Sequence, residues 1–338
     1  MDIQTAIKSM IARQDLSGDD MATVMRQIMT GECTPSQIGG FLVGLHMKGE
    51  SVDEISAAAK VMRELATRVN VSEERLVDTA GTGGDSSGSF NISTASALVA
   101  AAAGARVAKH GNRSMTSNSG SADVLEAAGV KLDISPEKVA ECVQRVGVGF
   151  MFAPAHHGAM KHAIGARKEL AVRTVFNVLG PLTNPAGAPN QVIGVFHQEL
   201  VELMANVLKQ LGSRHVMVVH AEDGMDEISI SAPTRVAELK DGKVSSYTIT
   251  PADFGMETAS LDELRVGSAE ESLAMIRGVF ADQPGPARDI VCLNAGAAIY
   301  VAGCADSLAE GIEAARSAIS SGKAAEVLQN LVVESNAG

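Results

Sequence analysis

The first seventy residues show apolar positions at helical spacing, and each expected helix begins at a residue that can cap free backbone amides. Three of these starts pair a cap with the third helical residue, so that each satisfies the other's donor. The pairs are Ser17 with Asp20, Thr34 with Gln37, and Ser51 with Glu54. We therefore expect a small all-helical N-terminal domain over residues 1–70, joined by part of 165–190.

After Asn70 the chain alternates between short apolar runs and helical patterns. The predicted strands are 76–79, 106–109, 149–153, 214–221 and 228–231, and the predicted helices are 94–103, 122–128, one that opens at Ser135-Pro136, 157–170, and most of the chain from about 268. Such alternation is typical of α/β domains. We expect a larger α/β domain over 71–338, with a mixed, mostly parallel central sheet flanked by helices.

Two segments are predicted to act as hinges between these parts. Gly180-Pro181 and Asn184-Pro185 break the chain, which makes 171–190 the first candidate. The stretch 70–76, where the pattern changes from helical to alternating, is the second.

Composition narrows the class of function. The 338 residues are 46% hydrophobic, which allows a sizeable core, and the net charge is -12. Nucleic-acid binding is disfavoured, because it depends on excess Lys and Arg and on aromatic stacking, and the chain has no Trp and two Tyr. The sequence has neither a signal-peptide pattern nor a run approaching ~18 apolar residues. We expect a cytoplasmic protein that does not contact membranes.

A glycine-rich segment, G-T-G-G-D-S-S-G-S-F-N-I-S-T at 81–94, follows the first predicted strand. It fits neither common nucleotide loop, because Ser86 stands where a dinucleotide loop has glycine and the chain has no G-x-x-x-x-G-K-[ST]. Glycine backbone and the amides at a helix start can surround phosphate oxygens. The alternative is a glycine turn in which Ser93 or Thr94 only caps the next helix.

A basic and polar segment, K-H-G-N-R-S-M-T-S-N-S-G-S at 109–121, follows the second predicted strand. Lys109 and Arg113 can neutralise phosphate charge, and His110 or Asn112 can recognise a polar organic group. The alternative is a solvated basic turn. In an acidic chain this local cluster favours an anion site.

An acidic segment, D-G-M-D-E at 223–227, follows the buried strand predicted at 214–221. Magnesium is commonly bound through one or two carboxylates plus substrate phosphates, which suits the pair Asp226 and Glu227. The alternative is an acidic turn. All three segments follow predicted strands, where open α/β sheets commonly bind ligands. Together they indicate an anionic, magnesium-bound phosphate ester as substrate.

The stretch 157–170 is rich in His, Lys and Arg. His157 and Arg167 are ten residues apart, nearly three helical turns, so both can face one pocket. Arg167 can clamp a substrate carboxylate, although Lys168 or Arg173 can equally be that cation. The alternative is a solvated basic helix.

Taken together and in order, several motifs closely resemble the anthranilate phosphoribosyltransferase family of tryptophan biosynthesis. They are G-T-G-G-D, N-I-S-T, K-H-G-N-R-S, S-G-S-A-D-V-L-E, R-T-V-F-N-V-L-G-P-L-T-N-P and D-G-M-D-E-I-S. The resemblance covers nearly the whole chain. It implies a magnesium-dependent glycosyltransferase that moves the phosphoribosyl group of 5-phospho-α-D-ribose 1-diphosphate (PRPP) to the amine of anthranilate. It also implies two magnesium ions with the bound diphosphate, and a homodimer formed through the helical part.

The resemblance further implies site residues, carried over by motif. For PRPP they are Gly81, Gly84, Asp85, Ser89, Asn91, Ile92, Ser93, Thr94, Lys109, His110, Gly111, Asn112, Arg113, Ser114, Met115, Thr116, Ser117 and Ser121. For anthranilate they are Gly81, His110, Asn112, His157, Arg167 and Pro181, and for magnesium Ser93, Asp226 and Glu227. No catalytic acid or base is implied, and Lys109 and Arg167 have electrostatic and positioning roles.

Two other classes of function stay open. A pyrimidine nucleoside phosphorylase of related architecture also handles ribose and phosphate, but it would not need the acidic metal pair. A non-catalytic paralogue that binds nucleic acid is opposed by the acidic balance of the chain and by the intact Asp226–Glu227 pair.

Overall fold

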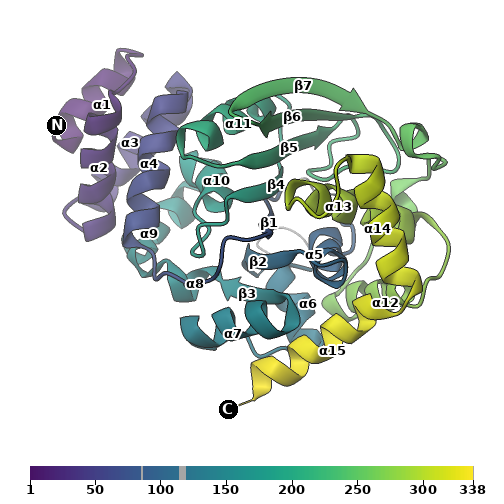
Figure 1. Cartoon of the computed structure of the whole chain (residues 1–338). Helices are drawn as coiled ribbons and strands as arrows, with labels where there is room; N and C mark the ends of the chain where they lie inside the picture. Colours follow the sequence, from purple (N-terminus) through teal and green to yellow (C-terminus); the bar gives the residue numbers. More distant parts are fainter. Residues whose placement is uncertain (85–86, 114–118, 338) are drawn as a thin grey trace.

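The computed structural model describes residues 1–84, 87–113 and 119–337 (Figure 1). Its N-terminal part consists of helices α1 (Ile3–Ile11), α2 (Gly18–Thr30), α3 (Pro35–Lys48) and α4 (Val52–Leu65). The side chains of Ser17, Thr34 and Ser51 each accept a hydrogen bond from the expected backbone amide, as predicted. The reciprocal bond is confirmed for Gln37 and Glu54, whereas the Asp20 carboxylate accepts from the Ser17 hydroxyl instead. The small helical domain therefore begins its helices where the sequence predicts.

The larger part is built on a seven-stranded sheet in the order β3-β2-β1-β4-β5-β6-β7 within the described chain. The strands are β1 (Leu76–Gly81), β2 (Arg106–Gly111), β3 (Val148–Phe152), β4 (Asn190–Gly194), β5 (His215–Ala221), β6 (Thr234–Lys240) and β7 (Lys243–Ile249). Strands β1 to β5 pair in parallel, and β6 and β7 are antiparallel. The predicted mixed, mostly parallel sheet is confirmed. Strand order reverses between β1 and β4, the point at which open α/β sheets bind ligands.

Helices cover both faces of the sheet. On one face α5 (Ile92–Ala102) and α13 (Pro286–Val301) contact each other and the central strands, and their core includes Val77 and Leu98. On the other face α11 (Leu200–Gln210) lies against β5, β6 and α4. The remaining larger helices are α6 (Ser121–Ala127), α7 (Pro136–Val146), α12 (Ala269–Phe280), α14 (Leu308–Ser320) and α15 (Lys323–Asn336).

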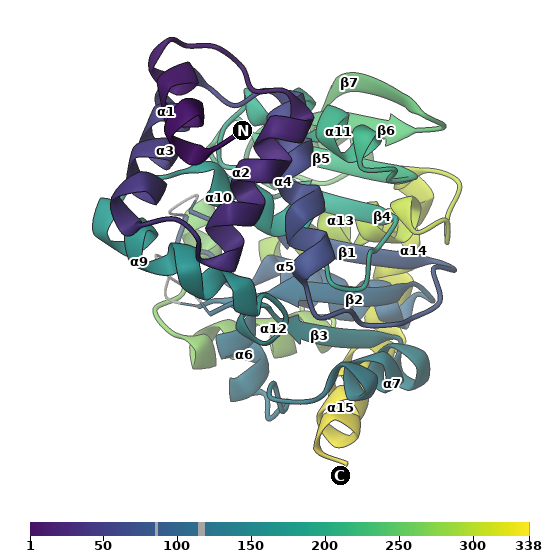
Figure 2. The ribbon, with the colours of Figure 1, turned by 90° about the vertical axis from the view of Figure 1, so that its left-hand side faces the viewer.

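The helical part shares a core with the second face of the sheet. Met25 and Leu45 of the helical part belong to the same buried cluster as Met204 of α11 and Val218 of β5. Short elements bring the chain back to these helices: α8 (Ala153–His156), η1 (Gly158–Met160), α9 (Lys161–Leu170), α10 (Val175–Leu179) and η2 (Gly180–Leu182). Figure 2 shows α9 beside α2 and α3, which it contacts.

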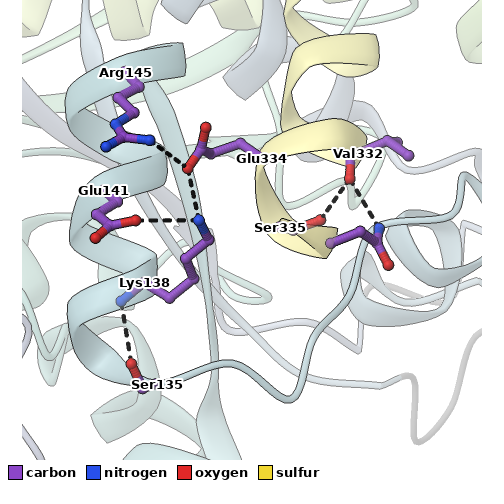
Figure 3. Close-up of polar contacts among 8 residues, drawn as sticks. Ser135, Lys138, Glu141, Arg145, Val332, Glu334 and Ser335 are labelled. Carbon is purple, nitrogen blue, oxygen red and sulfur yellow. Dashed lines mark hydrogen bonds and ion pairs between the residues drawn. The ribbon is translucent and has the colours of Figure 1, made fainter. Parts of the chain in front are cut away.

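The C-terminal helix α15 is fastened to α7 by an ion-pair cluster (Figure 3). Lys138 donates to Glu334 at 2.7 Å, and Arg145 reaches the same carboxylate at 3.3 Å. Because α15 also contacts α5, this cluster steadies the helix that follows the glycine-rich segment. No helix in the described ranges is long and apolar enough to cross a bilayer.

Two expectations from the sequence are wrong in detail. The run 228–231 is not a strand, because the hydroxyls of Ser229 and Ser231 donate to Asp223 and fold the segment into a turn. The helix expected over 157–170 is interrupted, since a 3-10 turn at Gly158–Met160 precedes α9. The backbone of His157, with φ -114° and ψ 53°, is not helical, so the α-helix begins only after this turn.

Candidate active site

The loops that follow the parallel strands meet at one edge of the sheet. Gly83, after β1, donates its backbone N–H to Asp226 Oδ2 at 2.9 Å. Gly194, at the end of β4, lies so close to the Asp226 backbone that a Cβ there would overlap the Asp226 carbonyl oxygen. Only glycine fits that position, so the acidic segment can lie against the end of β4, beside Gly81 at the start of the glycine-rich segment.

The start of α5 is capped by Asn91. Its Oδ1 accepts from the Thr94 amide at 3.0 Å and from the Ser121 hydroxyl at 3.3 Å, and its Nδ2 donates to the Ser119 carbonyl at 3.2 Å. The interpretation that Ser93 or Thr94 caps this helix is therefore wrong. Asn91 ties the glycine-rich segment to the end of the basic segment.

Lys109 lies beneath this helix start, and it is only 2% exposed. Its Nζ donates to the Thr79 carbonyl at 2.5 Å and to the Ser93 hydroxyl at 3.1 Å. Burial lowers the pKa of Lys109, while the charges of Asp78 and Glu227 oppose that shift. Lys109 thus holds Ser93, a predicted magnesium ligand, through the hydrogen bond to its hydroxyl.

Asp78 of β1 is fully buried and holds two neighbouring segments. Its Oδ1 accepts from the His110 amide at 3.1 Å and its Oδ2 from Asn184 Nδ2 at 2.7 Å. Burial raises its pKa to about 6, and the Asn184 hydrogen bond and the Lys109 charge oppose the rise. Asp78 therefore links the end of β2 with the segment that contains Pro181.

His110 and His157 form a buried pair of imidazoles, with ring centroids 5.0 Å apart. Burial lowers the pKa of His157 to about 4 and that of His110 well below its ordinary value, so both rings are neutral at pH 7. Within the part of the chain that the structure describes, neither Nε2 has a hydrogen-bond partner. Two buried ring nitrogens without partners are available to hydrogen-bond a polar group of a ligand.

The candidate cations differ in what they contact. Arg113 pairs with Glu126 at 2.7 Å and with Asp123 at 3.2 Å, so its guanidinium lies against α6. Arg167 of α9 is partly buried, 5.2 Å from the ring centroid of Phe176, and burial lowers its pKa.

Arg173, the alternative to Arg167, reaches the glycine-rich segment. It donates to the Gly84 carbonyl at 2.6 Å, and its guanidinium lies 3.8 Å over the ring centroid of Phe196. Phe196 in turn donates its backbone N–H to the Thr82 hydroxyl. Arg173 therefore links the α9–α10 connection to the loop after β1.

Other predicted residues lie along the same edge. Ser89 pairs with Arg265 through an isolated antiparallel β-bridge of the backbone. Ile92 is buried, and the Asn112 carbonyl accepts a hydrogen bond from the Ala122 amide at 3.3 Å. Gly111 is closely packed, because a Cβ there would lie 3.0 Å from the Phe150 ring. The predictions for Asp85, Ser114, Met115, Thr116 and Ser117 fall outside the described residues.

A small cavity at the ends of β1 and β4 includes residues that the sequence did not single out. Its lining is Thr79, Ala80, Ser93, Ser96, Val192, Gly194, Glu227 and Asn294. Thr79 and Asn294 lie in a predicted strand and a predicted helix, where they pass for structural residues. A single asparagine within the apolar run of α13 is the one signal that singles out Asn294.

The donor set at this edge fits magnesium. Ser93, Asp226 and Glu227 offer oxygen atoms only, which a hard divalent cation prefers. Among the described residues, no three or more His, Cys, Asp or Glu side chains gather to hold a metal ion. A carboxylate pair is what magnesium uses when substrate phosphates and water complete its coordination.

Comparisons with known proteins agree with this geometry. Residues 73–325 match the glycosyl transferase family a/b domain, and residues 4–66 match the helical bundle domain of that family. The chain is 71% identical to anthranilate phosphoribosyltransferase of Thioalkalivibrio sulfidiphilus, over 98% of each chain. The chain belongs to the anthranilate phosphoribosyltransferase family. It is also 61% identical to the Cellvibrio japonicus enzyme of this name, again over 98% of each.

Solved structures of anthranilate phosphoribosyltransferases have the same fold. The enzyme of Thermus thermophilus superposes with a TM-score of 0.93 at 45% identity, covering 98% of this chain and 99% of that one. The enzyme of Saccharomyces cerevisiae, in complex with PRPP and Mg, gives 0.89 at 25% identity, covering 98% and 97%.

Proposed function

We propose that this protein transfers the phosphoribosyl group of PRPP to the amine of anthranilate, giving N-(5-phosphoribosyl)anthranilate and diphosphate, in L-tryptophan biosynthesis. Because the chain belongs to this family, one structural observation supports the proposal most directly. The Gly83–Asp226 hydrogen bond joins a glycine-rich loop to the carboxylate segment at the edge where the sheet reverses its strand order.

Binding of PRPP is assigned to the glycine-rich loop and to the helix start that Asn91 caps. Backbone amides there can donate to phosphate oxygens, and Lys109 adds a positive charge below. Ser93, Asp226 and Glu227 would hold magnesium, for which we propose two ions. Bound magnesium would neutralise the charge that grows on the departing diphosphate.

Binding of anthranilate is assigned to the pocket around His110, His157 and Pro181, with Asn112 and Arg167 at the carboxylate. The new bond joins the amine nitrogen to the anomeric carbon. The bond from that carbon to the diphosphate oxygen breaks, and the departing diphosphate keeps the electron pair. The amine then releases one proton to the diphosphate or to water. An arylamine is unprotonated at neutral pH, so correct placement in line contributes more than a strong base.

The domain boundaries are part of the proposal: 1–70 with part of 165–190 as the helical domain, and 71–338 as the PRPP-binding domain. At their junction Arg63 donates to the Leu182 carbonyl at 2.6 Å and the Thr67 amide to the His156 carbonyl at 2.8 Å. We infer that the helical domain closes over the PRPP-binding domain by hinge motion at 70–76 and 171–190. This closure would shield the activated sugar from water. Identical scattering profiles with and without both substrates would contradict closure.

A homodimer through the helical part is supported by exposed apolar side chains on two adjacent helices. Ile11 of α1 is 76% exposed and Met47 of α3 is 69% exposed, and burial of such surface favours association. We also propose that the protein acts in the cytoplasm.

The test is the fluorescence of anthranilate in the presence of PRPP. We expect it to decay with magnesium and to persist after chelation with EDTA. Phosphorolysis of thymidine or uridine without magnesium, in place of this decay, would instead establish the nucleoside phosphorylase.

A further inference from the structure

Asn294 of α13 is a buried amide with all its hydrogen bonds made to backbone. It is 3% exposed. Its Oδ1 accepts from the Ile228 N–H at 2.9 Å, and its Nδ2 donates to the carbonyls of Ile228 and Ile290, each at 2.9 Å. One side chain thus holds both backbone polar groups of Ile228, as a neighbouring strand would.

Ile228 directly follows the carboxylate pair, so this clamp acts on the metal segment. Asn294 also lines the same cavity as Glu227 and Ser93. On the other flank Asp223 accepts from the Met225 amide at 3.1 Å. The backbone that carries Asp226 and Glu227 is therefore fixed on both sides.

The helix that presents Asn294 is itself held closely. A Cβ on Gly296 would lie 2.7 Å from the backbone nitrogen of Ile312, so α13 and α14 approach at van der Waals distance through glycine. A side chain on such a support has little freedom to shift. The clamp can therefore set the position of its target within a narrow range.

We propose that Asn294 is a positioning residue for magnesium, which acts through Ile228 to hold the Asp226 and Glu227 carboxylates where the diphosphate-bound metal needs them. The inference rests on the proposed function and deepens its metal site. Asparagine suits the role because it offers one acceptor and two donors without charge. Leucine has a similar volume, but it would leave both polar groups of Ile228 without this partner.

The experiment measures Mn²⁺ binding in the presence of PRPP by electron paramagnetic resonance, which does not depend on turnover. We expect Asn294→Leu to weaken Mn²⁺ binding by about tenfold or more, as loss of an outer-shell partner does. Raising the Mg²⁺ concentration should restore much of its kcat. Unchanged Mn²⁺ affinity in the folded variant would overturn the proposal.

A matched control is available at the opposite edge of the sheet. Asn190, the first residue of β4, is also buried. Its Nδ2 donates to the Leu76 carbonyl at 2.9 Å. Asn190→Leu should lower the unfolding midpoint but leave Mn²⁺ affinity at the native value. Equal weakening by both variants would reduce the role of Asn294 to general stability and so overturn it.

Two further variants separate the possible failures. If Asn294→Leu does not fold, Asn294→Ser, which retains one hydroxyl near Ile228, is measured in its place. We again expect weaker Mn²⁺ binding, and unchanged Mn²⁺ affinity would again overturn the proposal. Asp226→Asn should abolish Mn²⁺ binding. Absence of PRPP-dependent Mn²⁺ binding in the native protein would instead overturn the proposed metal site, and with it this inference.

Discussion

Two lysines with little-exposed side chains, one in each part of the molecule, differ in the groups to which they donate hydrogen bonds. Lys48 of the helical part, with a side chain 3% exposed, donates to Asp15 at 2.5 Å and to Glu54 at 2.8 Å. Lys109 of the sheet donates to neutral oxygens of Thr79 and Ser93. Lys48 thus forms direct ion pairs, whereas Lys109 hydrogen-bonds neutral oxygens and has the carboxylates of Asp78 and Glu227 as its charged neighbours.

The pKa directions follow from these contacts. Burial alone lowers the pKa of Lys48, but its hydrogen bonds to Asp15 and Glu54 outweigh burial, so the net shift is upward. For Lys109 burial prevails over the charges of Asp78 and Glu227, so its pKa falls. We infer that Lys48 stabilises the fold and that Lys109 provides charge for an anionic ligand.

Lys48→Met should produce the largest change in stability. It leaves the fully buried Glu54 carboxylate without its cation, and breaking a buried pair costs about 3–5 kcal/mol. Urea unfolding measures this loss. Below the unfolding transition, the kcat/KM of the variant should stay within about twofold of native. A large fall in kcat/KM would contradict the inference that Lys48, unlike Lys109, acts only on stability.

Lys109→Met should instead act on catalysis. Removing a charge that stabilises the leaving diphosphate should lower kcat/KM by about 10²- to 10³-fold. Initial rates of anthranilate consumption measure the effect, with circular dichroism as the control for folding. Near-native rates would contradict the assignment.

Asp78→Asn tests the buried carboxylate near Lys109 through pH. The folded pKa of about 6 lies above the ordinary 3.8, so the contribution of Asp78 to stability is fully present below pH 3.8 and is lost as pH rises through 6. The free energy of unfolding of the native protein, minus that of the variant, should fall by up to ~3 kcal/mol between pH 4 and 7, at ~1.4 kcal/mol per pKa unit. A difference independent of pH would show that Asp78 titrates normally.

Arg167→Ala extends the comparison to the second substrate. Like Lys109, Arg167 has a pKa lowered by burial. Loss of a charged hydrogen bond to the anthranilate carboxylate should raise the KM for anthranilate roughly tenfold or more, with a smaller effect on kcat. An unchanged KM would remove Arg167 from that role and favour Arg173, which lies near the glycine-rich segment.

The sequence predicted those parts of the fold that local chemistry determines. Caps such as Thr34 with Gln37 and apolar runs such as the one that forms β5 need no tertiary information. Strand β4 was missed because Asn190 and Gln191 interrupt its apolar pattern. Their polarity is explained only by distant partners, since Asn190 donates to Leu76 and Gln191 to Pro181.

The site divides in the same way. The residues that follow strands, such as Gly83 and Asp226, could be placed on one edge from the sequence alone. Asn294 could not, because its partner Ile228 is sixty-six positions away and lies beside it only after α13 packs on the sheet.

The measurement that tests the contrast most directly is the stabilisation of each variant by PRPP with magnesium, read as the shift of the thermal unfolding midpoint. A ligand that binds only the folded state raises this midpoint, and at a fixed ligand concentration a tighter ligand raises it more. We predict equal ligand-induced stabilisation of the native protein and Lys48→Met, and a much smaller shift for Lys109→Met. A full shift in Lys109→Met would contradict the account.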